Sequence, residues 1–185
     1  NSKNLTKLFT YKNNLTPVLN IRSLKTPDSD ILIRHSIALE IISKVKSHKD
    51  FKTFANHISS RKPFDLEGNV VNDAKKFRLD KKGLKKPIIC YGKSKKIGYV
   101  ERDEITKNAK WIDNYKVFAP YANNIGTELN DDNLNAFVGE PKTICTETYI
   151  VMGATLNLDL ITSTNLVKYF FTKFARFMHS LPKVS

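Results

Sequence analysis

The chain has 185 residues and a mass of 21.1 kDa, the size of one ordinary domain or of one domain with a small appendage. Hydrophobic residues make up 41% of it, which excludes disorder over most of its length, and no stretch approaches the roughly 18 consecutive apolar residues of a membrane span. The 31 Lys and Arg residues against 18 Asp and Glu residues give a formal net charge of +13, which favours a polyanion as partner.

The first 28 residues are polar and contain Pro17 and Pro27, so we interpret residues 1–28 as a connecting segment with one short ordered stretch near residues 18–21. They lack the apolar core of a secretory signal, so we expect a cytoplasmic protein without a membrane partner. Because the chain begins at Asn1 and not at Met, we expect it to be a fragment of a longer protein.

Two helical stretches are expected next along the chain. Ser29 and Asp30 can cap a helix of about four turns, in which apolar residues repeat at helical spacing as far as Val45. Apolar residues on one side predict a second stretch over residues 51–58. Pro63 marks the end of this helical region, because proline disfavours helix at the residue before it.

From residue 87 the pattern becomes typical of strands. Residues 87–100 predict a hairpin whose polar tip, at residues 93–96, is rich in lysine. Further strands are expected at residues 115–118 and 143–152, and apolar residues at helical spacing predict a long C-terminal helix over residues 162–181. The predicted fold class is therefore α+β, with a mixed or antiparallel sheet, a lysine-rich hairpin, an N-terminal helical stretch and a long C-terminal helix.

Positive charge is concentrated in residues 75–96, which contain ten basic residues and one acidic residue, or +9 of the net +13. A solvated loop is one interpretation of such a run. The other is nucleic-acid binding, because a β-hairpin can enter the major groove of DNA and its lysines can contact phosphates, with an affinity that falls steeply with salt. The lysines placed on or next to the predicted hairpin are Lys85, Lys86, Lys93, Lys95 and Lys96.

Motifs for catalysis or cofactor binding are not found in this sequence. The glycine-rich patterns of phosphate-binding loops are missing, and the four histidines are scattered. Cys90 and Cys145 are too few for a disulfide scaffold, so reduced buried thiols are expected. We predict no metal site, no cofactor and no catalytic residue within this chain.

Five segments, in this order, resemble the conserved blocks of adenine-specific DNA methyltransferases of type II restriction–modification systems. They are FANHISSRKPFDL at residues 54–66, YVERDEITKN at 99–108, YKVFAPYA at 115–122, ICTETYIV at 144–151 and KYFFTKFARF at 168–177. The resemblance covers most of the chain from about residue 42 to residue 183. One departure is Asp65, which stands where the family usually has glycine.

In that family the corresponding region is the C-terminal target-recognition domain, or TaqI-like specificity domain, which follows the methyltransferase core. The resemblance implies that residues 29–185 recognise a site on double-stranded DNA and are not catalytic by themselves. It implies an upstream methyltransferase domain in the same polypeptide, which would bind S-adenosylmethionine. Some members of the family are also fused to a type II restriction endonuclease.

Candidate DNA contacts lie in two loops. The hydroxyls and cations of the first loop suit a phosphate clamp, although ordinary helix termination also explains them. In the second loop asparagine amides can read adenine edges, although turn chemistry is the commoner role of loop asparagine. The residues are Ser59, Ser60, Arg61, Lys62, Tyr121, Asn123 and Asn124.

The segment Thr146-Glu147-Thr148 is expected on a strand, with the two threonines on one face and Glu147 on the other. Glu147 can accept a hydrogen bond from cytosine or form a structural salt bridge with Lys116 or Arg176, and we favour the bridge. The aromatic residues of the last helix are expected in the core.

Two other classes of function remain open. One is a metal-dependent restriction endonuclease that uses Asp28, Glu140 and Lys142, which partly match a nuclease pattern. The other is a protein-interaction module, such as the specificity subunit of a multi-subunit restriction complex. The missing heptad repeat argues against the second of these.

Overall fold

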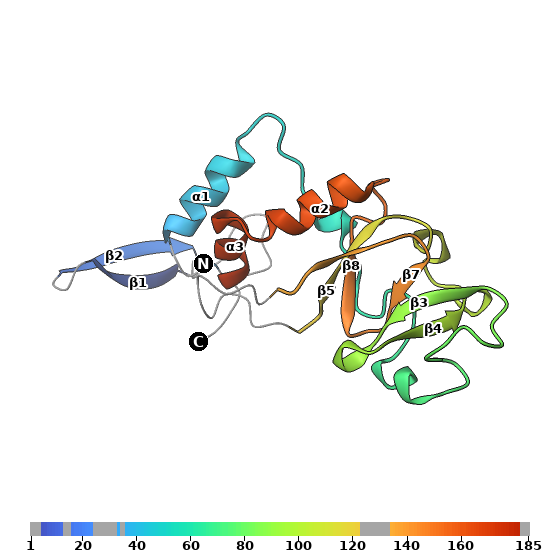
Figure 1. Cartoon of the computed structure of the whole chain (residues 1–185). Helices are drawn as coiled ribbons and strands as arrows, with labels where there is room; N and C mark the ends of the chain where they lie inside the picture. The colour runs from blue at the N-terminus through green and yellow to red at the C-terminus, as the bar shows by residue number, and fades with distance from the viewer. Residues whose placement is uncertain (1–4, 13–15, 24–32, 34–35, 123–133, 182–185) are drawn as a thin grey trace. The chain divides into compact units, whose positions relative to one another are not determined.

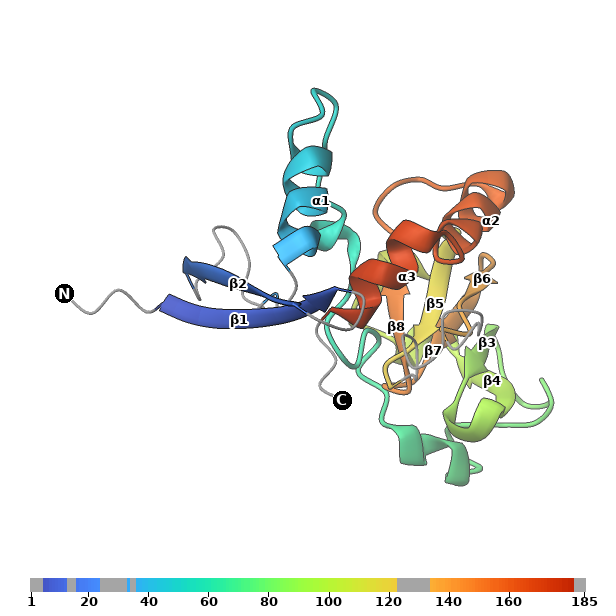
Figure 2. The same cartoon turned by 90° about the vertical axis from the view of Figure 1, so that its left-hand side faces the viewer.

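The computed structural model describes residues 5–12, 16–23, 33, 36–122 and 134–181. The chain divides into two compact units. One consists of residues 1–52 together with 177–185, and the other of residues 53–176. The elements within each unit can be followed in Figures 1 and 2. Helices and small mixed or antiparallel sheets together make the α+β class that the sequence predicts.

The first unit begins with a two-stranded antiparallel ribbon. Strand β1 (Leu5–Lys12) pairs with β2 (Thr16–Ser23) over the whole length of both strands. The sequence predicts only a short ordered stretch here. The segment is polar overall, but its strands are rich in threonine, aromatic and β-branched residues, which favour strands. Pro17 is compatible with β2 because it lies near the start of that strand.

Helix α1 (Ser36–Lys46) follows in the first unit. It confirms a helix in this part of the chain, but the proposed caps Ser29 and Asp30 lie outside the described residues. Ala38 on α1 is fully buried and belongs to a small apolar cluster with Ile33 and Leu181. This cluster is the core of the first unit.

The second unit contains two three-stranded sheets. In the first sheet, β3 (Pro87–Tyr91) lies between β4 (Ile97–Glu101), with which it forms the predicted hairpin, and β7 (Thr143–Cys145), to which it is parallel. In the second sheet, β5 (Lys116–Pro120) lies between two antiparallel neighbours, β6 (Phe137–Gly139) and β8 (Tyr149–Met152). Figure 2 shows the two sets of strands side by side.

The predicted single strand over residues 143–152 is instead two strands that belong to different sheets. The chain turns between β7 and β8, where the amide of Tyr149 donates to the carbonyl oxygen of Thr146. The hydroxyl of buried Thr146 donates to the Thr148 hydroxyl across the turn at 3.1 Å. The predicted alternation of faces at these residues is therefore wrong, because they form a corner and not an extended strand.

The predicted long C-terminal helix is also divided. Helix α2 (Leu160–Tyr169) ends before a three-residue break, and α3 (Lys173–Ser180) begins after it. The Thr172 hydroxyl accepts a hydrogen bond from the amide of Ala175, as an N-cap residue does, so a new helix starts where the apolar spacing alone predicts continuation.

Helix α2 starts at a capping box, in which the Asp159 side chain and Thr162 satisfy each other's amides. It lies against β5 and β6, and Phe170 beyond its end packs on the second sheet. The other aromatic residues of this region are only partly in the core, since Tyr169 and Phe171 are 46% and 44% exposed.

The predicted second helical stretch over residues 51–58 is reduced to a single 3-10 turn, Ala55–His57. Directly after it, Ile58 forms a β-bridge with Met152 at the edge of β8. This pairing with the sheet ends the helical conformation well before Pro63.

The main core of the second unit lies between the two sheets. Its buried side chains come from both sheets and from the loops between them, and include Phe64, Phe77, Ile88, Cys90, Val100, Ile112, Phe118, Ile144, Cys145 and Val151. As expected, Cys90 and Cys145 are buried and form no disulfide. The helices of the described residues include none with the length and hydropathy of a membrane span.

Part of the basic segment is tied to the hairpin before β3 begins. Arg78 forms a β-bridge with Tyr99 on β4, with amide-to-carbonyl distances of 2.9 and 2.7 Å. The ring of Phe77 lies so close to Gly98 that a Cβ there would stand 2.4 Å from it. A glycine in β4 is therefore required for this segment to lie against the hairpin.

Candidate nucleic-acid interface

The loop at residues 59–67 is fastened to the second sheet at its start. The Ser59 amide donates to the carbonyl oxygen of Val151 at 2.8 Å, and the Ser59 hydroxyl accepts from the Val151 amide at 2.9 Å. The Ser59 side chain therefore joins the loop to β8, whereas the neighbouring Ser60 is exposed.

The middle of the same loop is held from the opposite side. Phe64 is 2% exposed and packs edge-to-face on Trp111, with ring centroids 6.4 Å apart. The Lys107 ammonium donates to the carbonyl oxygen of Lys62, and the Asn108 side-chain amide donates to that of Pro63. These contacts join residues 59–67 to residues 107–111.

Asp65 adopts a left-handed backbone conformation, with φ of 59°. Its amide donates to the carbonyl oxygen of Lys62 and closes a turn, and its side chain is exposed. Glycine adopts this φ without steric cost, and aspartate is one of the few other residues that tolerate it. The conformation therefore suits an aspartate at this position.

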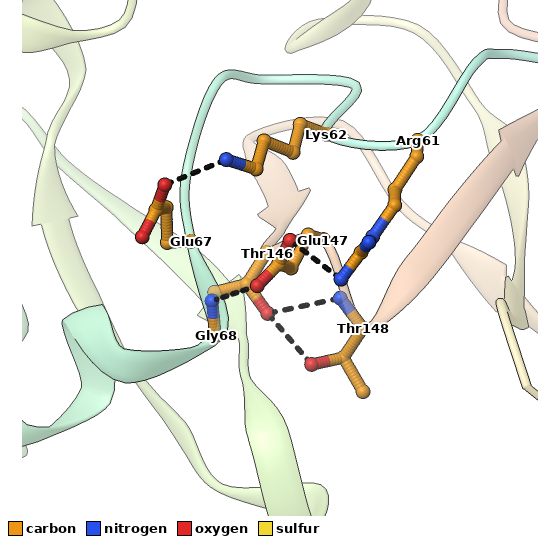
Figure 3. A network of polar contacts seen from close by, with 7 residues as sticks. All are labelled: Arg61, Lys62, Glu67, Gly68, Thr146, Glu147 and Thr148. Carbon is orange, nitrogen blue, oxygen red and sulfur yellow. Dashed lines mark hydrogen bonds and ion pairs between the residues drawn. The ribbon is translucent and has the colours of Figure 1, made fainter.

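Arg61 projects from the loop towards the corner between β7 and β8. One of its guanidinium nitrogens lies 3.0 Å from a carboxylate oxygen of Glu147, and the guanidinium lies 5.3 Å from the centroid of the Tyr121 ring. The other carboxylate oxygen of Glu147 accepts a hydrogen bond from the amide of Gly68 at 3.0 Å. Figure 3 shows Arg61 and Gly68 converging on Glu147.

The salt bridge that we expect at Glu147 is thus present, but its predicted partners are wrong. Lys116 is fully buried elsewhere, and the ion pair shown for Glu147 is with Arg61. The two residues are 86 positions apart in the sequence, and their meeting depends on the corner, which the strand pattern does not reveal.

Lys62 turns away from Arg61 and binds Glu67, with the ammonium nitrogen 2.6 Å from a carboxylate oxygen. This hydrogen bond raises the pKa of Lys62 above its ordinary value and lowers that of Glu67. Lys62 is therefore already matched by a carboxylate, and a phosphate would have to compete with Glu67 for it.

Three of the predicted contact residues line one surface pocket of about 420 Å³, namely Arg61, Lys93 and Tyr121. The Arg61 and Tyr121 side chains are largely exposed there, at 57% and 54%, while that of Glu147 is only 20% exposed. Sequence reasoning missed Glu67, Gly68 and Asn69, which also line the pocket. No sequence pattern marks these three residues, because only the fold brings them to Arg61.

The predicted lysines lie at the two opposite ends of the hairpin formed by β3 and β4. Lys93, Lys95 and Lys96 are exposed at the tip, whereas Lys85 and Lys86 precede β3 at the other end, about 16 Å away at about 3.3 Å per strand residue. The amides of Lys85 and Lys86 donate to the Glu101 carboxylate, and the Lys86 ammonium pairs with Asp103 at 3.0 Å. Only the tip is therefore continuous with the pocket.

Asn123 and Asn124, the predicted adenine-reading residues, lie outside the described residues. Asp28 of the alternative nuclease set also lies outside them, and Glu140 and Lys142 are exposed. Within the part of the chain that the structure describes, no three His, Cys, Asp or Glu side chains gather as a metal site would require.

No protein-family model matches the chain, and searches of curated proteins and of solved structures find no match.

Proposed function

We propose that this chain is the DNA target-recognition domain of an adenine-specific methyltransferase from a type II restriction–modification system. The observation that supports this most directly is the pocket in which Arg61, Tyr121 and Lys93 meet beside the exposed lysines of the hairpin tip. Arg61, Tyr121 and Glu147 come from three of the blocks that resemble that family, and they are in contact.

The chemistry of the pocket suits recognition better than simple phosphate binding. Its cations, Arg61 and Lys93, are offset by the carboxylates of Glu67 and Glu147, so it is not a uniformly positive cradle. Glu147 fixes one edge of the Arg61 guanidinium, and the Tyr121 ring lies beside it. An arginine held in this way presents its remaining donors in a fixed direction, which is what bidentate recognition of guanine requires.

In this proposal the two kinds of cation have different roles. Lys93, Lys95 and Lys96 at the tip contact phosphates and set the affinity and its salt dependence. Arg61 contacts a base edge and contributes specificity. The domain itself performs no chemistry, and methyl transfer from S-adenosylmethionine belongs to a domain that precedes it in the parent polypeptide.

The test is fluorescence anisotropy of a labelled mixed-sequence duplex with the full chain over a salt series. We expect binding at low salt that weakens steeply as salt is added, and a loss of affinity in Arg61→Ala and Lys93→Ala. The matched control is Lys168→Ala, which removes an exposed lysine on α2. Binding no tighter than that of a neutral protein, or equal losses in all three variants, would contradict the proposal.

The link to methyl transfer has a separate test in the gene that encodes the parent protein. An Asn/Asp-Pro-Pro-aromatic motif encoded upstream of this region supports the proposal. An upstream sequence that encodes no methyltransferase motif contradicts this part of it and leaves DNA binding to be judged on the anisotropy result.

A further inference from the structure

A second surface pocket, of about 430 Å³, lies where the two sheets of the second unit meet. Its walls come from the end of β3 (Tyr91), from β6 (Phe137) and from the start of β8 (Tyr149). Pro120 at the end of β5 and Ile97 at the start of β4 also line it, and Lys95 of the hairpin tip stands at its edge. The volume lies within the range of pockets that hold small organic groups, about 300–1,000 Å³.

The walls of this pocket are aromatic rings that support one another. The Phe137 ring lies edge-on to Tyr91 and Tyr149, with centroid distances of 4.9 and 5.6 Å. Behind them the fully buried Phe118 contacts Tyr91 and Phe137 at 5.5 and 5.4 Å. Because the buried ring fixes the outer rings, the pocket is formed before any ligand enters.

Two tyrosines add phenol groups to the walls of the pocket: Tyr91 is half-buried, and Tyr149 is 7% exposed. Burial raises the pKa of both phenols above the ordinary value of 10.0, with Glu140 adding to the effect at Tyr91. Both hydroxyls therefore stay protonated at neutral pH and can donate or accept hydrogen bonds.

The charge around the pocket selects among aromatic-binding ligands. Lys95 is the charged side chain among the described residues that line it, and Lys93 and Lys96 belong to the same turn. Aromatic cages can bind cations such as methylated lysine, but the Lys95 ammonium would repel a cationic ligand here. A planar neutral group that is linked to an anion fits both the rings and the ammonium.

We infer that this pocket receives a single nucleobase of DNA that has left the base stack, with a phosphate of the same nucleotide against Lys95. The inference rests on the proposed function and extends it from duplex contact to an unstacked nucleotide. The rings supply stacking surface, the two hydroxyls meet the edge of the base, and Lys95 anchors the backbone. This pocket is distinct from the one around Arg61. Lys93 lines the Arg61 pocket, whereas Lys95 lines this one.

A bulged nucleotide in a duplex presents an unstacked base at a chosen place. The experiment therefore does not require the recognised DNA sequence to be known. Three duplexes of one sequence are compared in anisotropy titrations with the full chain: fully paired, with one bulged thymidine, and with one bulged abasic nucleotide. The abasic bulge bends the duplex like the thymidine bulge but has no base to insert. We expect the chain to bind the thymidine bulge at least about fivefold more tightly than the abasic bulge. This factor corresponds to the lower end of the binding energy gained when one base stacks on aromatic side chains.

Two variants locate the effect at this pocket. Phe137→Leu removes the aromatic face while keeping apolar volume, and Lys95→Ala removes the anchoring charge from an exposed position that folding does not need. Both are expected to abolish the preference for the thymidine bulge over the abasic bulge. Lys82→Ala, at another exposed lysine of the basic segment, is the matched control and should keep the preference.

The outcomes separate this inference from the proposed function. If the chain binds all three duplexes equally, the unstacked-base pocket is overturned while duplex recognition stands. A preference that survives in both Phe137→Leu and Lys95→Ala overturns it as well, because the base is then held elsewhere. If the chain binds none of the duplexes at low salt, the proposed function fails first and the inference fails with it.

Discussion

Lys116 is a lysine buried in the core of a basic protein. It lies on β5 with none of its surface exposed, and its ammonium donates to the carbonyl oxygens of Ile112, Asn114 and Glu140 at 2.8–3.3 Å. These three bonds join the loop before β5 to the residue that follows β6. Burial lowers the pKa of Lys116 to about 8 from the ordinary 10.5, so a change in its charge falls near physiological pH.

We predict that Lys116 makes the fold more stable as the pH rises above about 8. Its folded pKa lies below its unfolded pKa, so between about pH 8 and 10.5 the unfolded state binds more protons, and the free energy of unfolding rises with pH. From pH 7 to pH 9 this gain is about 1 kcal/mol. Urea unfolding at both pH values measures it.

The control for this prediction is Lys116→Met, which keeps an apolar stem and cannot titrate. It loses three hydrogen bonds and is less stable at every pH, but its change between pH 7 and 9 should lack the contribution of Lys116. The comparison must be made between variants, because the buried thiols of Cys90 and Cys145 have raised pKa values and act in the opposite direction above about pH 9. Parallel pH curves for the two proteins would contradict the prediction.

Single residues also show where sequence reasoning reaches its limit in this chain. Burial of Cys90 and exposure of the tip lysines could be predicted, because each depends on local composition and alternation. The pairing of Arg61 with Glu147 could not, because it depends on a long-range contact that only the folded corner creates. A salt bridge at Glu147 is the interpretation that the sequence favours, but the sequence does not identify Arg61 as the partner.

At the scale of elements, boundaries proved harder to predict than the elements themselves. The hairpin of β3 and β4 is found as expected, because a polar turn separates two β-branched runs. The run at residues 143–152 and the apolar spacing of residues 162–181 both continue across a break. Both breaks occur at threonines, whose hydroxyls bond to nearby groups and stabilise a turn or cap without interrupting the apolar pattern.

The hairpin tip is an element whose sequence does not suit its backbone. Ser94 and Lys95 both have positive φ, 58° and 59°, and the amide of Lys96 donates to the carbonyl oxygen of Lys93. These are features of a type I′ turn, in which the second central position favours glycine. In our proposal the charge of Lys95 contacts a phosphate, so its contribution to binding would offset its cost to the turn.

We therefore predict that Lys95→Gly stabilises the protein while it weakens binding. Glycine removes the steric cost of the left-handed conformation, which should raise the free energy of unfolding by about 0.5–1 kcal/mol. The same change should abolish the preference for a bulged thymidine over an abasic bulge. Urea unfolding and anisotropy on one preparation measure both effects.

Lys93→Gly is the control for the turn, because Lys93 is not among the residues with positive φ. It should bring no gain in stability. A Lys95→Gly variant that is both more stable and fully able to select the bulged base would show that the turn carries this lysine for no functional reason.

At the scale of the whole molecule, charge is distributed unevenly within the second unit. Residues 53–176 carry 20 Lys and Arg against 14 Asp and Glu, a net charge of +6, yet residues 75–96 alone carry +9. The rest of that unit therefore carries −3. A polyanion, the partner in our proposal, would be attracted most strongly to this segment.

Two double variants decide how much of the basic segment a duplex contacts. They remove equal charge from the opposite ends of the hairpin, Lys93→Ala with Lys96→Ala at the tip and Lys85→Ala with Lys86→Ala at the base. If the tip lysines each neutralise one phosphate, the tip variant should reduce the slope of log K against log salt by about 1.8, since each phosphate contact contributes about 0.9. The base variant should reduce it by less than half as much, because Asp103 already pairs with Lys86 and the base lies away from the pocket around Arg61. Equal reductions would mean that the duplex contacts the whole length of the hairpin. A larger reduction in the Lys85 and Lys86 variant would place the duplex too far from Arg61 for its side chain to contact a nucleobase.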